Sequence, residues 1–343
     1  TVTSAAYAGG TLTLLDGSTT VATLRLSGNY AGATFITAPT ATTGVTQIQV
    51  QEVTPSTISP SDDFEAHGLS DVLIQNTSGA VVLGELGTNG QEAYAQVSGL
   101  GPGWSFHGSG DFVGSGARDY LIENTNGAVD VGQVAGGQTT YSQVAALGPE
   151  WRFRETGDFM GDGKSDFLIE NTGGAVVVGE IVGGRAQYTP VAALGPEWTF
   201  VGSGDFLGDA KDQFLIQNTK GAVVVGEVSG GRTTYTQVGA LGREWRFVEA
   251  GQFLGDAKTD FLIENTSGAV VVGEVAGGRT TYTQVGGLGP EWSFVGAGDY
   301  SGTGTDSYLI ENTNGAILTG TVVAGHAQYI QVGALGPEWR FHG

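Results

Sequence analysis

Residues 151–197 read WRFRETGDFMGDGKSDFLIENTGGAVVVGEIVGGRAQYTPVAALGPE, and this stretch decides the fold. It contains four short apolar runs, WRF to GDF, DFLIEN, AVVVGEI and QYTPVAAL, which are rich in Val, Ile, Phe, Tyr and Thr. None of the runs has the length or the 3.6-residue spacing of a helix. The connections Asn-Thr-Gly-Gly and Gly-Gly-Arg are typical of tight hairpins, because glycine accepts the positive φ of primed turns. The stretch therefore predicts a four-stranded antiparallel meander.

The same pattern occurs six times with a period of 47 residues. All six tryptophans follow it: Trp104, Trp151, Trp198, Trp245, Trp292 and Trp339. Six tyrosines (Tyr94, Tyr141, Tyr188, Tyr235, Tyr282, Tyr329) and six asparagines (Asn76, Asn124, Asn171, Asn218, Asn265, Asn312) also recur, with one extra residue near 87–90. Four strands per repeat of this length are typical of a β-propeller blade. We therefore expect an all-β, six-bladed β-propeller over residues 56–343.

The two ends of the repeat array complement each other. Near Thr57 the first copy has Thr-Ile-Ser-Pro where the other copies have Trp-x-Phe. The C-terminus carries an additional Trp339-Arg340-Phe341 with no repeat after it. Because an open array of sheets would expose unpaired edges, we expect this C-terminal strand to complete the first blade and close the ring.

Residues 1–55 do not follow the period. The segment TLTLLDGSTTVATLRL predicts a hairpin that turns at Asp16-Gly17. We interpret this region as a small β appendage or the tail of a preceding domain. A seventh, degenerate blade is the alternative, although the Trp, Tyr and Asn landmarks are missing from it.

Composition excludes several classes of protein. Glycine and proline together make up about a fifth of the 343 residues, less than is typical of disordered chains. No apolar stretch is long enough to cross a bilayer as a helix, so no membrane insertion is expected. The formal charge of −21 disfavours binding to phosphate backbones, which argues against a nucleic-acid partner. With no cysteine, disulfides and thiolate chemistry are excluded.

The run GDFMGDGKSDFLIENT, residues 157–172, resembles the FG-GAP or VCBS-type repeat, and the resemblance covers residues 57–343. In that family the repeats build β-propellers in secreted or surface proteins of bacteria, in lectin-like modules and in integrin heads. The resemblance also implies an acidic loop that binds Ca²⁺ through oxygens at loop positions 1, 3, 5 and 9, a chemistry that suits this hard cation.

The third copy comes nearest to such a loop, with Asp158, Asp162 and Asp166, although Met160 stands at position 3. We expect either no cofactor or a single weak calcium ion at these three residues. The alternative is that the carboxylates accept backbone N–H groups within a tight loop. In the first copy, His67 stands at position 5 between Asp63 and Asp71 and departs from the pattern.

No catalytic motif is evident, and the four histidines have no metal-ligand spacing. The recurring glutamates Glu123, Glu170, Glu264 and Glu311 are expected to have near-identical environments, which does not suit an acid and base pair. We expect a non-enzyme. The candidate contacts with a ligand or with another subunit are Arg185, Arg232 and Arg279, in the Gly-Gly-Arg turns, together with Trp151, Trp198 and Trp245. For the arginines the alternative is solubilisation, and for the tryptophans it is packing between blades.

Repetition suits multivalent binding better than catalysis. We therefore expect an extracellular or cell-surface binding or adhesion module, with polysaccharide, extracellular matrix or a surface protein as partner. One alternative is a structural subunit of a surface layer or filament, in which copies of the chain contact one another through the N-terminal strands. The second alternative is a targeting module of a secreted hydrolase.

Overall fold

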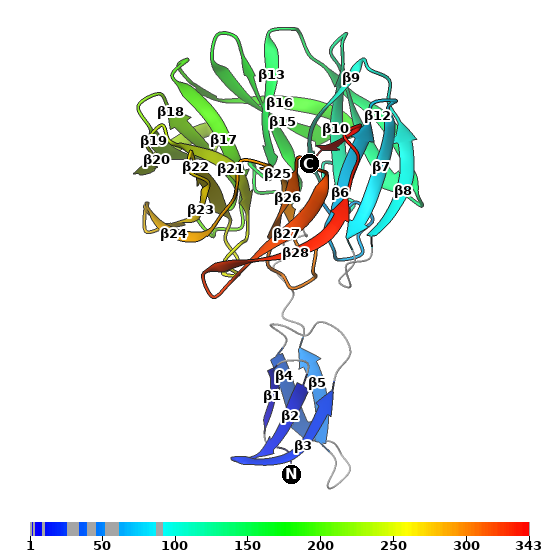
Figure 1. Cartoon of the computed structure of the whole chain (residues 1–343), viewed down its shortest axis with the longest axis vertical. Coiled ribbons are helices and arrows are strands. Elements are labelled where there is room, and N and C mark those ends of the chain that lie inside the picture. Colours follow the sequence, from blue (N-terminus) through cyan, green and yellow to red (C-terminus); the bar gives the residue numbers. More distant parts are fainter. Residues whose placement is uncertain are drawn as a thin grey trace. The chain divides into compact units, whose positions relative to one another are not determined.

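The computed structural model describes residues 2, 4–8, 11–25, 34–39, 46–51, 62–86 and 92–342, and every regular element in these ranges is a β-strand (Figure 1). The chain falls into two compact units, Thr1–Ile58 and Ser59–Gly343. The sequence-based boundary between residues 55 and 56 lies outside the described residues. No helix in these ranges is long or apolar enough to cross a membrane.

The N-terminal unit contains one three-stranded and one two-stranded antiparallel sheet. Its strands are β1 (Ser4–Ala8), β2 (Thr11–Asp16), β3 (Thr19–Arg25), β4 (Thr34–Pro39) and β5 (Thr46–Gln51). The hairpin expected at Asp16-Gly17 joins β2 to β3, and Gly17 adopts a φ of 61° there. Leu12 and Leu14 are buried while β3 is exposed along its length. The unit therefore does not repeat the four-stranded blade, and the seventh-blade alternative is wrong.

The second unit is the six-bladed β-propeller that the period predicts, with one four-stranded antiparallel sheet per blade (Figure 1). Blade 1 consists of β29 (Trp339–His342), β6 (Asp71–Asn76), β7 (Ala80–Leu86) and β8 (Glu92–Gly99). Blade 2 consists of β9 (Trp104–Gly110), β10 (Asp119–Asn124), β11 (Ala128–Ala135) and β12 (Gln138–Ala146). Blade 3 consists of β13 (Trp151–Gly157), β14 (Asp166–Asn171), β15 (Ala175–Val182) and β16 (Arg185–Ala193).

Blade 4 consists of β17 (Trp198–Gly204), β18 (Gln213–Asn218), β19 (Ala222–Ser229) and β20 (Arg232–Ala240). Blade 5 consists of β21 (Trp245–Gly251), β22 (Asp260–Asn265), β23 (Ala269–Ala276) and β24 (Arg279–Gly287). Blade 6 consists of β25 (Trp292–Gly298), β26 (Ser307–Asn312), β27 (Ala316–Val323) and β28 (His326–Ala334). The first strands of neighbouring blades contact one another around the inside of the ring, and fourth strands such as β8, β20 and β24 lie at its periphery (Figure 1).

The C-terminal strand closes the ring as the sequence predicts. Strand β29 pairs antiparallel with β6, so that Trp339 lies opposite Asn76 and Phe341 lies opposite Ile74. Blade 1 thus takes its first strand from one end of the unit and its other three strands from the opposite end. Its sheet order, β29-β6-β7-β8, matches that of the other five blades.

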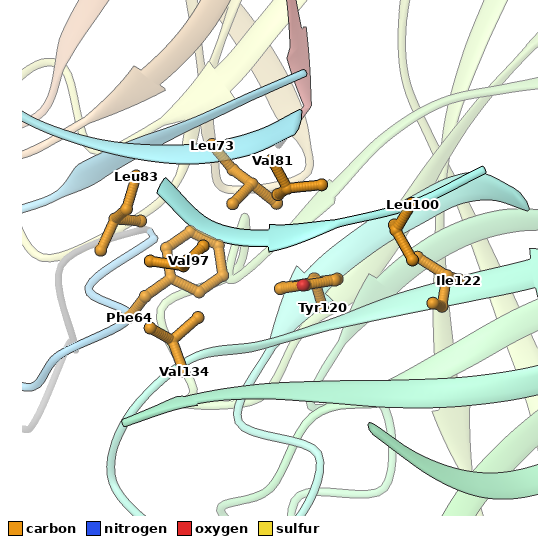
Figure 2. Close-up of a cluster of buried hydrophobic side chains, with 9 residues drawn as sticks. All are labelled: Phe64, Leu73, Val81, Leu83, Val97, Leu100, Tyr120, Ile122 and Val134. Carbon is orange, nitrogen blue, oxygen red and sulfur yellow. The ribbon is translucent and has the colours of Figure 1, made fainter. Parts of the chain in front are cut away.

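The hydrophobic core is divided into six clusters, one at each junction between neighbouring blades. At the junction of blades 1 and 2, for example, the side chains of Leu73, Val81 and Val97 meet Tyr120 and Ile122 of the next blade (Figure 2). The apolar face of each sheet is therefore buried only against its neighbours, which makes the six blades interdependent.

In blades 2 to 6, one glycine of the third strand allows an aromatic ring of the second strand to lie flat against it. A Cβ added to Gly226 would lie 2.3 Å from Phe214 Cε2, and the same clash recurs at Gly179 with Phe167 and at Gly273 with Phe261. These glycines are required for close approach, because their φ values are ordinary for a strand.

We predict that Gly226→Ala lowers the free energy of unfolding by about 2–3 kcal/mol, since the buried Phe214 ring would have to leave its rotamer. Gly101→Ala is the matched control, because nothing lies within 4 Å of its added Cβ, and it should change stability by less than about 0.5 kcal/mol. Urea denaturation measures both variants. Equal stability of the two would contradict the packing role.

Candidate functional site

The antiparallel order of each blade assigns the loops to two opposite rims, as expected. The acidic loops between first and second strands share one rim with the Gly-Gly turns between third and fourth strands. We call this the loop rim. The Asn-Thr-x-Gly turns and the Leu-Gly-Pro-Glu links share the other rim, where Thr172 N–H donates to the Glu150 carbonyl at 3.0 Å.

The three candidate arginines occupy equivalent places on three successive blades. Arg185, Arg232 and Arg279 are the first residues of β16, β20 and β24, and all three side chains are exposed. Each follows a two-glycine turn with left-handed φ, such as 59° and 77° at Gly183 and Gly184. Blades 2 and 6 have Gln138 and His326 at the equivalent position.

A half-exposed tyrosine lies three residues after each of these arginines. Tyr188, Tyr235 and Tyr282 are 42%, 43% and 39% exposed, and each packs edge-to-face on a buried Phe of its own blade with ring centroids 6.2 Å apart. The hydroxyl reaches toward the neighbouring blade, since a Cβ added to Gly239 in β20 would lie 2.8 Å from Tyr282 Oη.

Threonine and glutamine complete this surface. We use the name outer strip for the exposed side chains among the first six residues of each fourth strand, which in β20 are Arg232, Thr234, Tyr235, Thr236 and Gln237. The outer strips of β20 and β24 each offer an aromatic ring, hydroxyls, an amide and a guanidinium group. The 47-residue period places the same strand on every blade, but Gln187 and Pro190 replace one Thr and the Gln in β16.

The candidate tryptophans lie at the blade junctions. Trp151, Trp198 and Trp245 are partly buried and pack against the clusters between blades 2 and 3, 3 and 4, and 4 and 5. Packing therefore uses much of each indole surface. The exposed repeated aromatic residues are the tyrosines, which sequence reasoning treated only as landmarks of the period.

The third acidic loop uses its carboxylates mainly to hold the backbone. Asp158 accepts N–H groups from Gly161, Asp162 and Gly163 at 2.6–3.0 Å, and Asp166 Oδ2 accepts the Met160 N–H at 2.9 Å. Lys164 Nζ lies 3.2 Å from Asp162 Oδ2. Within the described ranges, Asp158, Asp162 and Asp166 are not among the groups whose ligand atoms all come within 4.8 Å of one another. A weak calcium site there stays a prediction.

The fourth loop shows what the buried carboxylate at position 9 does. Gln213 replaces it, accepts the Leu207 N–H at 3.0 Å and donates to Asp209 Oδ1 at 2.9 Å. Asp166 and Asp260 accept the same backbone contact, yet their Oδ1 atoms are buried without a hydrogen bond from any described residue. Burial raises the pKa of both carboxyls to about 7. A neutral amide can therefore replace the carboxylate at this position and keep the backbone contact.

The first loop brings together a cluster that sequence reasoning did not propose. Asp63, His67 and Asp71 offer ligand atoms that all lie within 4.8 Å of one another, and in the part of the chain that the structure describes no other group of three does so. His67 Nε2 lies 3.0 Å from Asp71 Oδ1. Asp63 and Asp71 each lie four residues from His67 in the sequence. Because His67 stands where the calcium loop of the family has an oxygen ligand, comparison with the family pattern treated the histidine as the loss of a ligand.

An open pocket of about 370 Å³ lies where the first strands of blades 1, 2 and 3 meet. His107, His342 and Glu155 contribute its titratable groups, together with Arg154. His107 stacks on Phe153 with ring centroids 4.3 Å apart, and His342 stacks on Phe106 at 4.0 Å. Burial lowers the pKa of both imidazoles, that of His342 to about 4, and raises the pKa of Glu155 to about 7. At neutral pH the two imidazoles are therefore uncharged and serve as packed rings.

The recurring glutamates of the second strands do not have the near-identical environments expected from their repetition. Glu123 Oε2 lies 3.2 Å from His107 Nε2, whereas Glu170 Oε2 pairs with Arg154 at 2.8 Å and Glu264 pairs with Arg246. That expectation is wrong, because the partner residues on the first strands differ between blades.

Several buried or partly buried acids lie close enough to Arg118 for its charge to act on them. Arg118 Nε lies 3.9 Å from Asp62 Oδ1, and its charge also acts on Asp212 and Asp306. Burial raises the pKa of all three aspartates, that of Asp306 to about 6. The pKa of Glu249 is raised to about 8, mainly by burial and to a smaller extent by the charge of Asp62. One cation thus faces more carboxyls than it can neutralise.

Comparison with known proteins gives the fold and no family. No family model matches the chain, and no curated protein matches it. Among solved structures, an arginine-to-alanine triple mutant of AofleA from Arthrobotrys oligospora matches with a TM-score of 0.52, 12% identity and coverage of 79% of this chain and 84% of that one. Unmutated AofleA has a TM-score of 0.50 at 10% identity and the same coverage. A Lactobacillus plantarum protein matches less well, with a TM-score of 0.43, 14% identity and coverage of 76% and 82%. At these identities the first two likenesses support the propeller architecture alone.

Proposed function

We propose that the protein is a non-enzymatic, multivalent binding module that acts outside the cell or on its surface and contacts an extended polysaccharide through the outer strips. The single observation that carries this proposal is the recurrence of an exposed Arg and a half-exposed Tyr on successive blades. Tyrosine and arginine are enriched where proteins make specific contacts, because each combines a large planar surface with a polar group.

A repeating polymer is the partner that fits a repeating surface. Tyrosine rings can stack on sugar rings, while the Thr, Gln and Arg side chains supply donors and acceptors for sugar hydroxyls and carboxylates. Single strips are expected to bind weakly. Contacts on several blades to one polymer raise the overall affinity by about 10²–10⁴-fold without any new type of contact. The resemblance of the repeats to FG-GAP and VCBS sequences, which occur in secreted and surface proteins, supports the same proposal.

Arginine substitutions on opposite rims test the proposal. We expect the combined Arg185→Ala, Arg232→Ala and Arg279→Ala variant to lose at least about 30-fold in affinity for a bound polysaccharide, because three blades lose a contact together. The matched control combines Arg152→Ala, Arg243→Ala and Arg340→Ala, which removes the same charge from exposed positions toward the opposite rim. Binding is measured by biolayer interferometry against immobilised neutral and acidic polysaccharides, at low and high salt.

Two results would contradict the proposal. One is the lack of binding to every polysaccharide of the panel. The other is an equal loss of affinity in both triple variants, which would show that only net charge matters. Strong binding to neutral polysaccharides that is insensitive to salt would assign the contact to the tyrosines, whereas binding lost in salt would assign it to the arginines.

A further inference from the structure

We propose that the pocket where the first strands of blades 1, 2 and 3 meet binds one neutral monosaccharide, with Arg154, His107 and His342 as its contacts. This site is separate from the outer strips, and it does not depend on the polysaccharide-binding role proposed above. It rests on a break in the sixfold repetition that coincides with the pocket.

A β-bulge positions the fourth residue of the first strand. In blade 3, Phe153 and Glu155 pair with consecutive residues of β14, so that Arg154 between them is the extra residue. The same irregularity recurs in blades 2, 4, 5 and 6. A bulge re-aims a side chain out of the strict alternation of the strand, and bulges are over-represented beside active sites. The fourth residue can therefore differ between blades without a change in strand pairing.

This fourth residue divides the ring into an apolar half and a polar half. Blades 4, 5 and 6 have valine there, and each valine packs against the core cluster at the junction with the next blade: Val201, Val248 and Val295. Blades 1, 2 and 3 instead have the polar residues that line the pocket: His342, His107 and Arg154. Valine meets the packing needs of this position in half of the ring, so packing alone does not require polar residues in the other half. Their grouping on three neighbouring blades around one pocket indicates a binding site.

The polar side chains of the pocket present flat groups in fixed orientations. Each imidazole stacks on a phenylalanine of the next blade, which fixes the plane of the ring. Arg154 Nε and Nη2 both contact Glu170 Oε2, at 2.9 and 2.8 Å, which leaves further N–H groups of the guanidinium for a ligand. Aromatic planes can stack on a sugar ring, and a planar donor can bind its hydroxyls.

The charges around the pocket favour a neutral ligand. The Arg154 guanidinium is paired with Glu170, and burial lowers the pKa of both imidazoles. Glu155 Oε2 accepts a hydrogen bond from Ser203 Oγ at 3.4 Å, and burial is the main cause that raises the pKa of this glutamate to about 7. At neutral pH the pocket therefore holds little net charge that an anion or a cation could neutralise.

The size and the lining of the pocket suit a single sugar ring. Its volume of about 370 Å³ lies at the small end of the range of about 300–1,000 Å³ for ligand pockets. Phe106 and Phe341 add apolar surface to the polar groups of the lining. A sugar ring offers hydroxyls at its edge and C–H groups on its faces, so it matches both kinds of surface.

Isothermal titration at pH 7.5 with a panel of neutral hexoses, pentoses, deoxyhexoses and N-acetylhexosamines tests the proposal. We expect one site per chain for at least one sugar of the panel. Arg154→Val, His107→Val and His342→Val each introduce the residue that blades 4, 5 and 6 have at this position, and each should weaken binding by at least about tenfold. Arg152→Val is the matched control on the same strand, because its exposed side chain does not line the pocket, and it should bind as the wild type does.

The variants must be shown to fold, by circular dichroism and by their melting temperatures. Lack of binding by every neutral sugar of the panel would overturn the proposal, and so would equal affinities of the wild type and the three folded valine variants. Uronic acids and amino sugars are titrated in parallel. Binding of these charged sugars alone would also overturn the proposal, because the pocket would then select for charge.

Discussion

A chain that ends at Glu338 should lose at least about 3 kcal/mol of unfolding free energy and melt about 10 °C lower than the full-length protein. The deletion removes β29, which is the first strand of blade 1. Phe341 then leaves the cluster between blades 6 and 1, and Trp339 leaves the edge of β6. Loss of a fully buried Phe or Trp side chain costs about 3–5 kcal/mol, and here two partly buried aromatic side chains leave together. Loss of the strand also exposes the hydrogen-bonding edge of β6 inside the ring.

Differential scanning calorimetry measures this effect, with single substitutions as controls. Phe341→Ala should reproduce about half of the loss or more. Arg340→Ala should change stability little, because its exposed side chain donates to the carbonyls of the neighbouring residues Pro337 and Trp339. If the truncated chain melted at the same temperature as the full-length protein, closure of the ring by β29 would not contribute to stability.

The protein should be more stable at pH 5.5 than at pH 8. Burial is the first cause that raises the pKa of several carboxyls: Asp306 to about 6, Asp119, Glu155 and Asp260 to about 7, and Glu249 to about 8. In the unfolded chain these groups ionise near pH 4. Between pH 4 and these raised pKa values the folded protein holds protons that the unfolded chain has released. The free energy of unfolding therefore falls as pH rises through this window, by about 1.4 kcal/mol per pH unit for each group.

A single glutamate tests the direction of this effect. Glu249→Gln removes the carboxyl with the highest of these pKa values and keeps its shape. We expect the variant to be more stable than the wild type at pH 8 and equal to it at pH 4.5, when Glu249 of the wild type is protonated. Glu197→Gln changes an exposed side chain and is the control. Urea denaturation across this pH range measures the slopes, and a wild type that gains stability toward pH 8 would contradict the account.

Most of the fold could be predicted from the sequence because the blade motif is repeated six times. The Trp and Tyr spacing gave the blade count, and the mismatch between Thr57 and the C-terminal Trp339-Arg340-Phe341 indicated how the ring closes. Tight-turn chemistry was also readable, since the paired glycines adopt the left-handed φ that primed turns require. These features are local, and the period extends them to the whole ring.

The sites were harder to predict because they depend on what differs between repeats. Comparison with the family loop made His67 a departure, whereas the fold places it between two carboxylates. Arg118, Asp212 and Asp306 occupy the same loop position on alternate blades, and only closure of the ring brings their charges together. Exposure also separated the tyrosines from the tryptophans, a difference that the shared period did not reveal.

The dependence of affinity on polymer length tests the central claim most directly. The claim is that equivalent outer strips on successive blades bind one extended polysaccharide together. A polysaccharide that binds in the panel should bind at least about 100-fold more tightly than a fragment of it too short to span two blades. Equal affinity of the polymer and the short fragment, per binding unit, would contradict multivalent binding and would assign recognition to a single site.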